Sequence, residues 1–325
     1  MWTKGPVFVY TGQEEIPKDV VAVEFSSSVV AVPPGAFRGC HALKYLVLNE
    51  GLQRIGPDAF CDCTSLEVIK LPSTLVEIGR EAFFRCSALR ILVLNEGLQK
   101  IGAAAFVRCF SLESIAIPST IREIAGDSFY NCRALAAVTL HEGLQRIGPD
   151  AFCNCTSLES VNLPSTMKEI DYHAFYICNK LRHVVFNGVL QKIDDDAFCI
   201  CASLESIQFP RISTRLESFG RERSRNEILN KIHEIPYVEM VGDEIILSSA
   251  SFQGGQGWPA CKGSLDQIIR LITYYELKEA TTIFELALWK MNIMQGSISN
   301  DADKGTLHME VAGPVKEAVL QYFDQ

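Results

Sequence analysis

Leu66–Cys86 reads LEVIKLPSTLVEIGREAFFRC, and the spacing of its apolar residues decides the fold because the same spacing returns along most of the chain. The clearest marker is a phenylalanine that recurs every 23 residues, at Phe37, Phe60, Phe83, Phe106, Phe129, Phe152, Phe175 and Phe198. Self-similarity at a fixed period of this length is typical of repeat architectures, and eight matches without a slip exclude chance.

Other apolar columns keep a constant distance from each phenylalanine. A cysteine follows by three residues, at Cys40, Cys63, Cys86, Cys109, Cys132, Cys155, Cys178 and Cys201. A leucine follows by six, at Leu43, Leu66, Leu89, Leu112, Leu135, Leu158, Leu181 and Leu204. A unit of 23 residues cannot bury so many apolar side chains by itself, so neighbouring units must stack and share one core. The sequence therefore predicts a solenoid.

A short strand is expected in every unit. Residues 46–48 alternate between inward and outward positions, which is the pattern of a half-buried strand. Equivalent strands of stacked units should pair in parallel, about 4.8 Å apart, so eight rungs would span roughly 38 Å.

The pattern L-x-x-L-x-L-P-x-x-L-x-x-I-G-x-x-A-F-x-x-C resembles the BspA-type class of leucine-rich repeats over about residues 20–210. The resemblance implies a curved right-handed solenoid that binds proteins, in which none of the matched columns is catalytic. Many members of the class are secreted or surface-exposed. No apolar run in residues 1–10 is long enough for a signal peptide, so this sequence departs from that pattern.

The repeat divides the chain into four parts. We expect an N-terminal segment (1–19), a degenerate capping repeat (20–42), a leucine-rich repeat solenoid (43–212) and a mostly helical C-terminal region (213–325). The first repeat counts as degenerate because Glu14 stands where the register calls for phenylalanine, as is usual for a terminal cap. The predicted fold is a β-rich leucine-rich repeat solenoid with a mostly α-helical C-terminal cap.

A second period of 46 residues lies inside the first, because units with Asn/His-Glu-Gly at 49, 95 and 141 alternate with units with Pro-Ser-Thr at 72, 118 and 164. Charge follows the same alternation in the column Arg54, Glu77, Lys100, Glu123, Arg146, Glu169 and Lys192. A second column does so with one gap, at Lys44, Glu67, Arg90, Glu113, Ala136, Glu159, Arg182 and Glu205. Alternation makes each neighbouring pair attractive, which favours register control over a charged binding surface. Deleting one unit should then cost more stability than deleting a pair.

No motif in the chain indicates catalysis, a cofactor or a metal. The pairs Cys61/Cys63, Cys153/Cys155 and Cys199/Cys201 lie two to four rungs apart and cannot converge on one tetrahedral ion, so we expect buried, structural thiols. The six histidines lack a ligand spacing, and the loop at 254–259 is phosphate-loop-like only in its glycine content.

Composition narrows the partner and the compartment. The formal charge of -9 comes without a basic stripe, so nucleic acid is not an expected ligand. No segment reaches the length of a membrane span, so membrane insertion is not expected, and we predict a cytoplasmic or nuclear protein.

The open face of the sheet is the candidate binding surface. Its outward positions in the early units are Tyr45, Val47, Val68, Lys70, Ile91 and Val93. Exposed β-branched residues are ordinary in strands, but a contiguous apolar patch next to an aromatic is a usual anchor for a protein partner. We therefore expect a non-catalytic scaffold that binds a protein through this face.

The C-terminal region is expected to hold a hairpin over residues 238–247, a helix starting at Ser264, another over 282–294 and a last one opened by Pro314. It resembles the helical tail that follows BspA-type arrays in some microbial eukaryotes. We expect it to cap the last unit, and a self-standing module is the alternative. Two other functions stay open, a small enzymatic or regulatory domain carried by the solenoid and a secreted ligand-binding protein.

Overall fold

The computed structural model describes residues 7–188, 190–194, 196–209, 231, 238–241, 244–248 and 263–271. The chain divides into two compact units, Met1–Ile269 and Arg270–Gln325, and the repeats belong to the first. The helices predicted at 282–294 and after Pro314, and most of the polar stretch before residue 238, lie outside the described residues.

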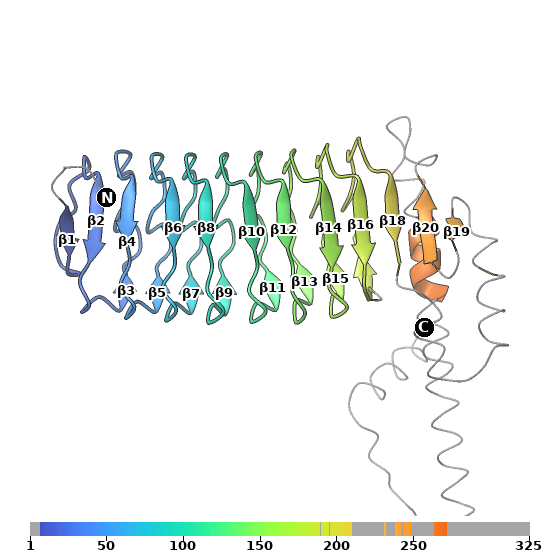
Figure 1. Ribbon diagram of the computed structural model, residues 1–325, viewed down its shortest axis with the longest axis horizontal. Coiled ribbons are helices and arrows are strands. Elements are labelled where there is room, and N and C mark those ends of the chain that lie inside the picture. Colours follow the sequence, from blue (N-terminus) through green and yellow to red (C-terminus); the bar gives the residue numbers. More distant parts are fainter. Residues whose placement is uncertain are drawn as a thin grey trace, which may run out of the picture. The chain divides into compact units, whose positions relative to one another are not determined.

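The first unit is a solenoid in which each repeat supplies one strand to the open sheet (Figure 1). These strands are β2 (Ala22–Phe25), β4 (Tyr45–Val47), β6 (Val68–Lys70), β8 (Ile91–Val93), β10 (Ser114–Ala116), β12 (Ala137–Thr139), β14 (Ser160–Leu163), β16 (His183–Phe186) and β18 (Ser206–Gln208). Every paired neighbour among them is parallel, and the partners are 23 residues apart. The structure thus confirms the parallel solenoid predicted from the period.

A second row of short strands runs along another side of the repeats (Figure 1). One sheet consists of β3 (Ala31–Val32), β5 (Arg54–Ile55), β7 (Glu77–Ile78) and β9 (Lys100–Ile101). The other consists of β11 (Glu123–Ile124), β13 (Arg146–Ile147), β15 (Glu169–Ile170) and β17 (Lys192–Ile193). The second residue of each strand is buried, Val32 in β3 and an isoleucine in the others, which explains the isoleucine column of the sequence.

The phenylalanine column forms the spine of the core. Consecutive rings from Phe37 to Phe198 stack with centroids 5.0–5.4 Å apart and planes within 12° of parallel. Tyr10 ends the column, because its ring meets Phe25 and Phe37 edge-on at 5.1 Å each. It thereby closes the core at the end where Glu14 interrupts the repeat pattern.

The third side of each repeat has an unusual backbone. Among the residues that the structure describes, two in each repeat adopt left-handed conformations, and fourteen of these are not glycine, such as Asp58 and Asp62 with φ of 54° and 59°. The N–H groups of Asp58, Phe60 and Asp62 each donate to a carbonyl of the next repeat over 2.7–2.9 Å. The same three bonds recur along the array, so this side is polarised, with its N–H groups directed towards the C-terminal end.

The 46-residue period has a structural cause in the two kinds of repeat. NEG repeats (43–65, 89–111, 135–157) carry Asn/His-Glu-Gly, and PST repeats (66–88, 112–134, 158–180) carry Pro-Ser-Thr. The Asn95 amide donates back to the Pro72 carbonyl of the preceding PST repeat over 2.7 Å. The Glu96 carboxylate accepts from the N–H and hydroxyl of Ser119 in the following PST repeat, over 3.1 and 3.0 Å. The NEG motif of residues 95–97 therefore bonds to the PST repeats on both of its sides.

Strand pairing on the open sheet follows the same alternation. β6 pairs with β8, and β10 with β12, over three residues each. By contrast, β8 pairs with β10 and β12 with β14 at a single residue, while β4 and β6 lie side by side without paired residues among those described. The sheet is thus loosest wherever an NEG repeat precedes a PST repeat.

Both ends of the solenoid are covered by strands. β1 (Phe8–Tyr10), in a segment for which the sequence predicted no element, pairs in parallel with β2. The predicted hairpin is confirmed as β19 (Val238–Val241) and β20 (Glu244–Ser248), and β20 pairs antiparallel with β18. A helix over residues 263–271 begins one residue before the predicted start at Ser264. The described cover of the sheet edge is therefore the hairpin, which protects unpaired strand groups from other chains.

Candidate functional site: the open face of strands β4, β6 and β8

The strand period places the predicted binding residues on the outside of the sheet. The central residue Ile69 of β6 is buried while its neighbours Val68 and Lys70 are exposed. β8 repeats this pattern around Leu92. Because side chains alternate across a strand, the burial of one column forces the columns on either side outward.

Four of the predicted residues form an exposed aliphatic strip. The exposed fractions are 49% for Val47, 44% for Val68, 42% for Ile91 and 48% for Val93. Val68 pairs directly with Ile91 in the ladder, so their side chains are cross-strand neighbours. Tyr45 is half-buried beside them. The structure therefore brings the predicted residues onto one face, although nothing in it tests whether a partner binds there.

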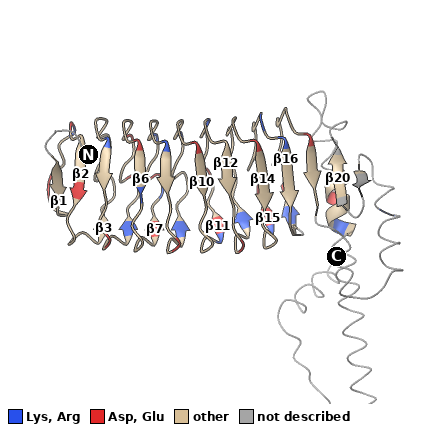
Figure 2. Cartoon of the chain, viewed as in Figure 1, with Lys and Arg blue, Asp and Glu red and all other residues tan. Residues whose placement is uncertain are grey.

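A row of alternating charges borders this strip at the strand starts (Figure 2). The Lys44 ammonium lies 2.9 Å from the Glu67 carboxylate, and this hydrogen bond raises the pKa of Lys44. Arg90 and Glu113 continue the row, and neither forms an ion pair with any residue that the structure describes. These two side chains are therefore open to an external charged group.

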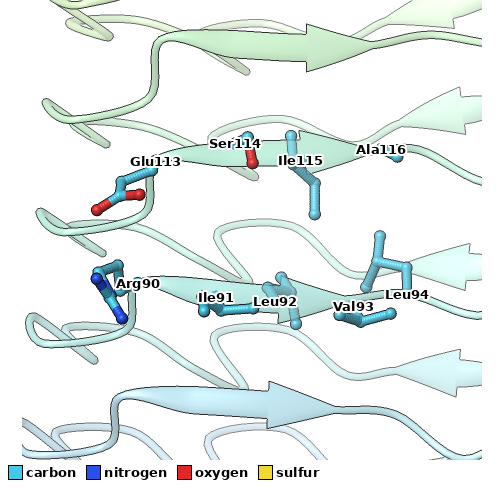
Figure 3. Close-up of a pocket in the computed structure, with 9 residues that line it drawn as sticks. All are labelled: Arg90, Ile91, Leu92, Val93, Leu94, Glu113, Ser114, Ile115 and Ala116. Atoms are coloured by element: carbon cyan, nitrogen blue, oxygen red, sulfur yellow. The ribbon is translucent and has the colours of Figure 1, made fainter.

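A pocket of about 270 Å³ lies between β8 and β10 (Figure 3). Arg90 and Glu113 stand at one end of it, and the remainder is lined by Ile91, Leu92, Val93, Leu94, Ser114, Ile115 and Ala116. Leu94 and Ile115 point into the space between the two strands (Figure 3). The pocket exists because these strands belong to a loose NEG-to-PST junction and pair only at Ile91 and Ser114.

The residues that sequence reasoning missed are those on the β10 side of this pocket. A signal was present, since Ser114 and Ala116 are small where the preceding repeat carries Ile91 and Val93. Small outward residues next to large ones create a step in the surface. Its depth depends on strand separation, which the sequence pattern does not show.

The charge column that begins at Arg54 contains ion pairs between neighbouring repeats, as its alternation predicts. Lys100 pairs with Glu77 at 2.9 Å, and Arg146 pairs with Glu123 at 2.9 Å and Glu169 at 3.5 Å. These side chains lie on the second row of strands, away from the aliphatic strip. They hold neighbouring repeats together and are occupied with one another.

The cysteine column is structural. Cys63, Cys86 and Cys109 are fully buried, and each thiol donates to the carbonyl of a phenylalanine 26 residues earlier, over 3.2–3.4 Å. Burial raises the pKa of Cys132 to about 12, and burial with the nearby Asp150 raises that of Cys153 to about 12. The thiolate is the reactive form, so such thiols are poor nucleophiles.

No group of three or more His, Cys, Asp and Glu side chains suited to a metal occurs within the described residues. Described histidines have local partners instead: His173 stacks between Tyr172 and Tyr176, and His41 bonds the Asp62 carbonyl. Among the same residues, no helix has the length and apolarity needed to cross a bilayer.

Several solved structures of leucine-rich repeat proteins are similar to this chain. The chain is similar to the T. pallidum leucine-rich repeat protein TpLRR (32% identity, TM-score 0.43), covering 47% of this chain and 72% of that one. It is also similar to a Bacteroides ovatus leucine-rich repeat protein (22% identity, TM-score 0.48; 59% and 56% covered). The chain is similar as well to a leucine-rich cell surface protein of Faecalibacterium prausnitzii (16% identity, TM-score 0.30), covering 66% of this chain and 87% of that one. No curated protein matches the sequence.

Family assignment rests on the repeats themselves. The family model of the BspA type leucine rich repeat region, six copies long, matches residues 18–136 and again 122–239. These two matches cover more than half of the chain and include the strip, the pocket and both charge columns. The family supports a repeat-based binding scaffold in general terms, and the chain belongs to the BspA-type leucine-rich repeat family.

Proposed function

We propose that the protein is a non-catalytic scaffold that binds a protein partner on the open face of β4, β6 and β8. The observation that carries this proposal is the strip of exposed aliphatic side chains at Val47, Val68, Ile91 and Val93, with a pocket at its edge. Aliphatic side chains gain about 25 cal/mol per Å² when a partner covers them, which is the usual driving force for protein association.

The chemistry of the remaining surface supports binding over catalysis. The buried thiols have raised pKa values, and charged side chains of the second strand row pair with one another, Lys100 with Glu77 and Arg146 with Glu123. The open face offers apolar surface bordered by single charges, which resembles the core and rim of a protein interface.

The test is affinity capture of proteins from a lysate of the source cells under reducing conditions. It compares the wild-type chain with a triple variant of the open face and with a double variant that serves as a control. Tyr45→Ser/Val68→Ser/Ile91→Ser removes the apolar contact, and Val30→Ser/Val76→Ser removes exposed aliphatic groups on the second strand row as a control. A protein captured by wild type and control but lost from the triple variant, with unchanged circular dichroism, supports the proposal. Equal capture by all three contradicts it.

We propose a reducing compartment, cytoplasmic or nuclear, as the location. What supports it is the set of free cysteines, whose thiols donate to backbone carbonyls within the core. Fractionation of source cells with an antibody to the chain checks this, and recovery in the medium or at the cell surface would contradict it.

A further inference from the structure

We propose that the open face binds a second copy of this chain, as a two-fold dimer whose axis runs along the strands, midway between β6 and β8. This inference rests on the proposed function, because it names the occupant of the same face. Two sheets packed in this way lie about 10 Å apart with their inner side chains interdigitated.

The alternating charges make this face complementary to itself. A two-fold axis between two rungs pairs each rung with the rung that lies equally far on the other side. Because the sign changes at every step, Glu67 then faces Arg90 of the second copy, and Lys44 faces Glu113. Arg90 and Glu113 make no ion pair with any described residue of their own chain, so both are available. Each dimer would contain both contacts twice.

The one gap in the charge alternation, at Ala136, also meets a suitable residue in this dimer. Ala136, which interrupts the charge row, is three rungs from the axis on one side. The matching position on the other side is Val21, which is 48% exposed and one repeat before Lys44. An apolar residue therefore meets an apolar residue at the single place where the charge pattern fails.

Side-chain size is complementary across the same axis. Val68 faces Ile91 of the second copy, and Lys70 faces Val93 of the second copy. Tyr45 faces Ser114, and Val47 faces Ala116, so larger side chains oppose the small residues that line the pocket. The pocket between β8 and β10 is thus the recess that receives β4 and β6 of the second copy. This isologous arrangement is the commonest form of oligomer symmetry.

Charge reversal tests this geometry on the full-length protein by analytical ultracentrifugation over a concentration series. Glu67→Arg and Arg90→Glu each create two like-charge contacts, and we expect each to weaken self-association by about tenfold or more. An equimolar mixture of the two variants regains opposite charges in both contacts, so its association should return to within about threefold of wild type. The double variant E67R/R90E should recover likewise.

Arg182→Glu is the matched control, because it lies in the same column but beyond the end of the facing array. We expect it to leave the association constant unchanged. A wild-type chain that stays monomeric throughout the series overturns the dimer, while the capture experiment with the triple variant still tests the scaffold. The proposal is also overturned if the charge reversals at 67 and 90 leave the association constant unchanged, or if Arg182→Glu lowers it equally. Failure of the mixture of the two variants to regain association overturns it as well.

Discussion

Deleting one repeat should lower the free energy of unfolding of this solenoid by more than the length removed accounts for. Removing residues 89–111, an NEG repeat, sets the PST repeat 66–88 directly against the PST repeat 112–134. The junction then lacks the Asn95 bonds to the carbonyls of Pro72 and Leu75, and the Glu96 bonds to Ser119. Removing 66–111 instead joins an NEG repeat to a PST repeat and keeps the motifs matched.

The magnitude follows from the bonds lost. A net hydrogen bond contributes about 1 kcal/mol, so the loss of these four bonds costs the mismatched junction about 4 kcal/mol. A repeat of 23 residues contributes about 1–3 kcal/mol at the usual stability per residue. The single deletion should therefore cost about 5–7 kcal/mol, which equals or exceeds the roughly 2–6 kcal/mol expected for removing two matched repeats. The exposed like-charge pair of Glu77 and Glu123 adds little in salt.

Urea unfolding followed by circular dichroism measures the effect. If length alone mattered, the midpoint of the single deletion would fall halfway between those of wild type and of the pair deletion, because the energies of repeat proteins are approximately additive. We expect it at or below the midpoint of the pair deletion. A value at or above the halfway point would refute the motif-matching argument.

Three further outcomes are expected. Ile177→Asn should raise the melting temperature, equivalent to about 1 kcal/mol, because a β-branched residue is held at φ 58° there; an unchanged or lower value in a thermal scan contradicts this. Phe106→Ala should cost about 3–5 kcal/mol in urea unfolding, far more than Tyr10→Ala, because Phe106 stacks on both sides while Tyr10 ends the column. The buried thiols, with a folded pKa of about 12 for Cys132 and about 8.5 when unfolded, give stability that is complete below about pH 8.5 and lost as pH rises towards the folded value. The urea midpoint in reductant should therefore fall from about pH 8 to about pH 11, and Cys132→Ala should flatten that fall; equal slopes would count against it.

The sequence predicted which side chains face outward better than it predicted how tightly neighbouring repeats are joined. Strand alternation alone placed Val68, Ile91 and Val93 outward, and the structure agrees. The alternation of the charge columns predicted attractive contacts between neighbouring repeats, and Lys100 and Glu77 form such a contact on the second strand row. Their control of register stays a prediction. The small residues Ser114 and Ala116 signalled a step in the surface, but the pocket beside Arg90 also depends on the separation of β8 and β10, which the residue pattern does not show.

The strands at the two ends of the solenoid were likewise predicted only in part. The hairpin that covers β18 was predicted from its turn, but its antiparallel pairing with the last rung was not. β1 went unpredicted because its spacing to β2 is 15 residues, as in the partners Phe8 and Val23, and breaks the period of 23. A strand added outside the period leaves no periodic signal.

What the sequence determined by itself is the solenoid, its 23-residue rungs, its inward columns and its two kinds of repeat. A fixed apolar period admits one stacking register, because any slip would move buried side chains into water. Only the tertiary structure decided which junctions are tight and which are loose, and therefore where the pocket lies. Those features depend on backbone hydrogen bonds between repeats, and every residue except proline has the same backbone donor and acceptor whatever its side chain.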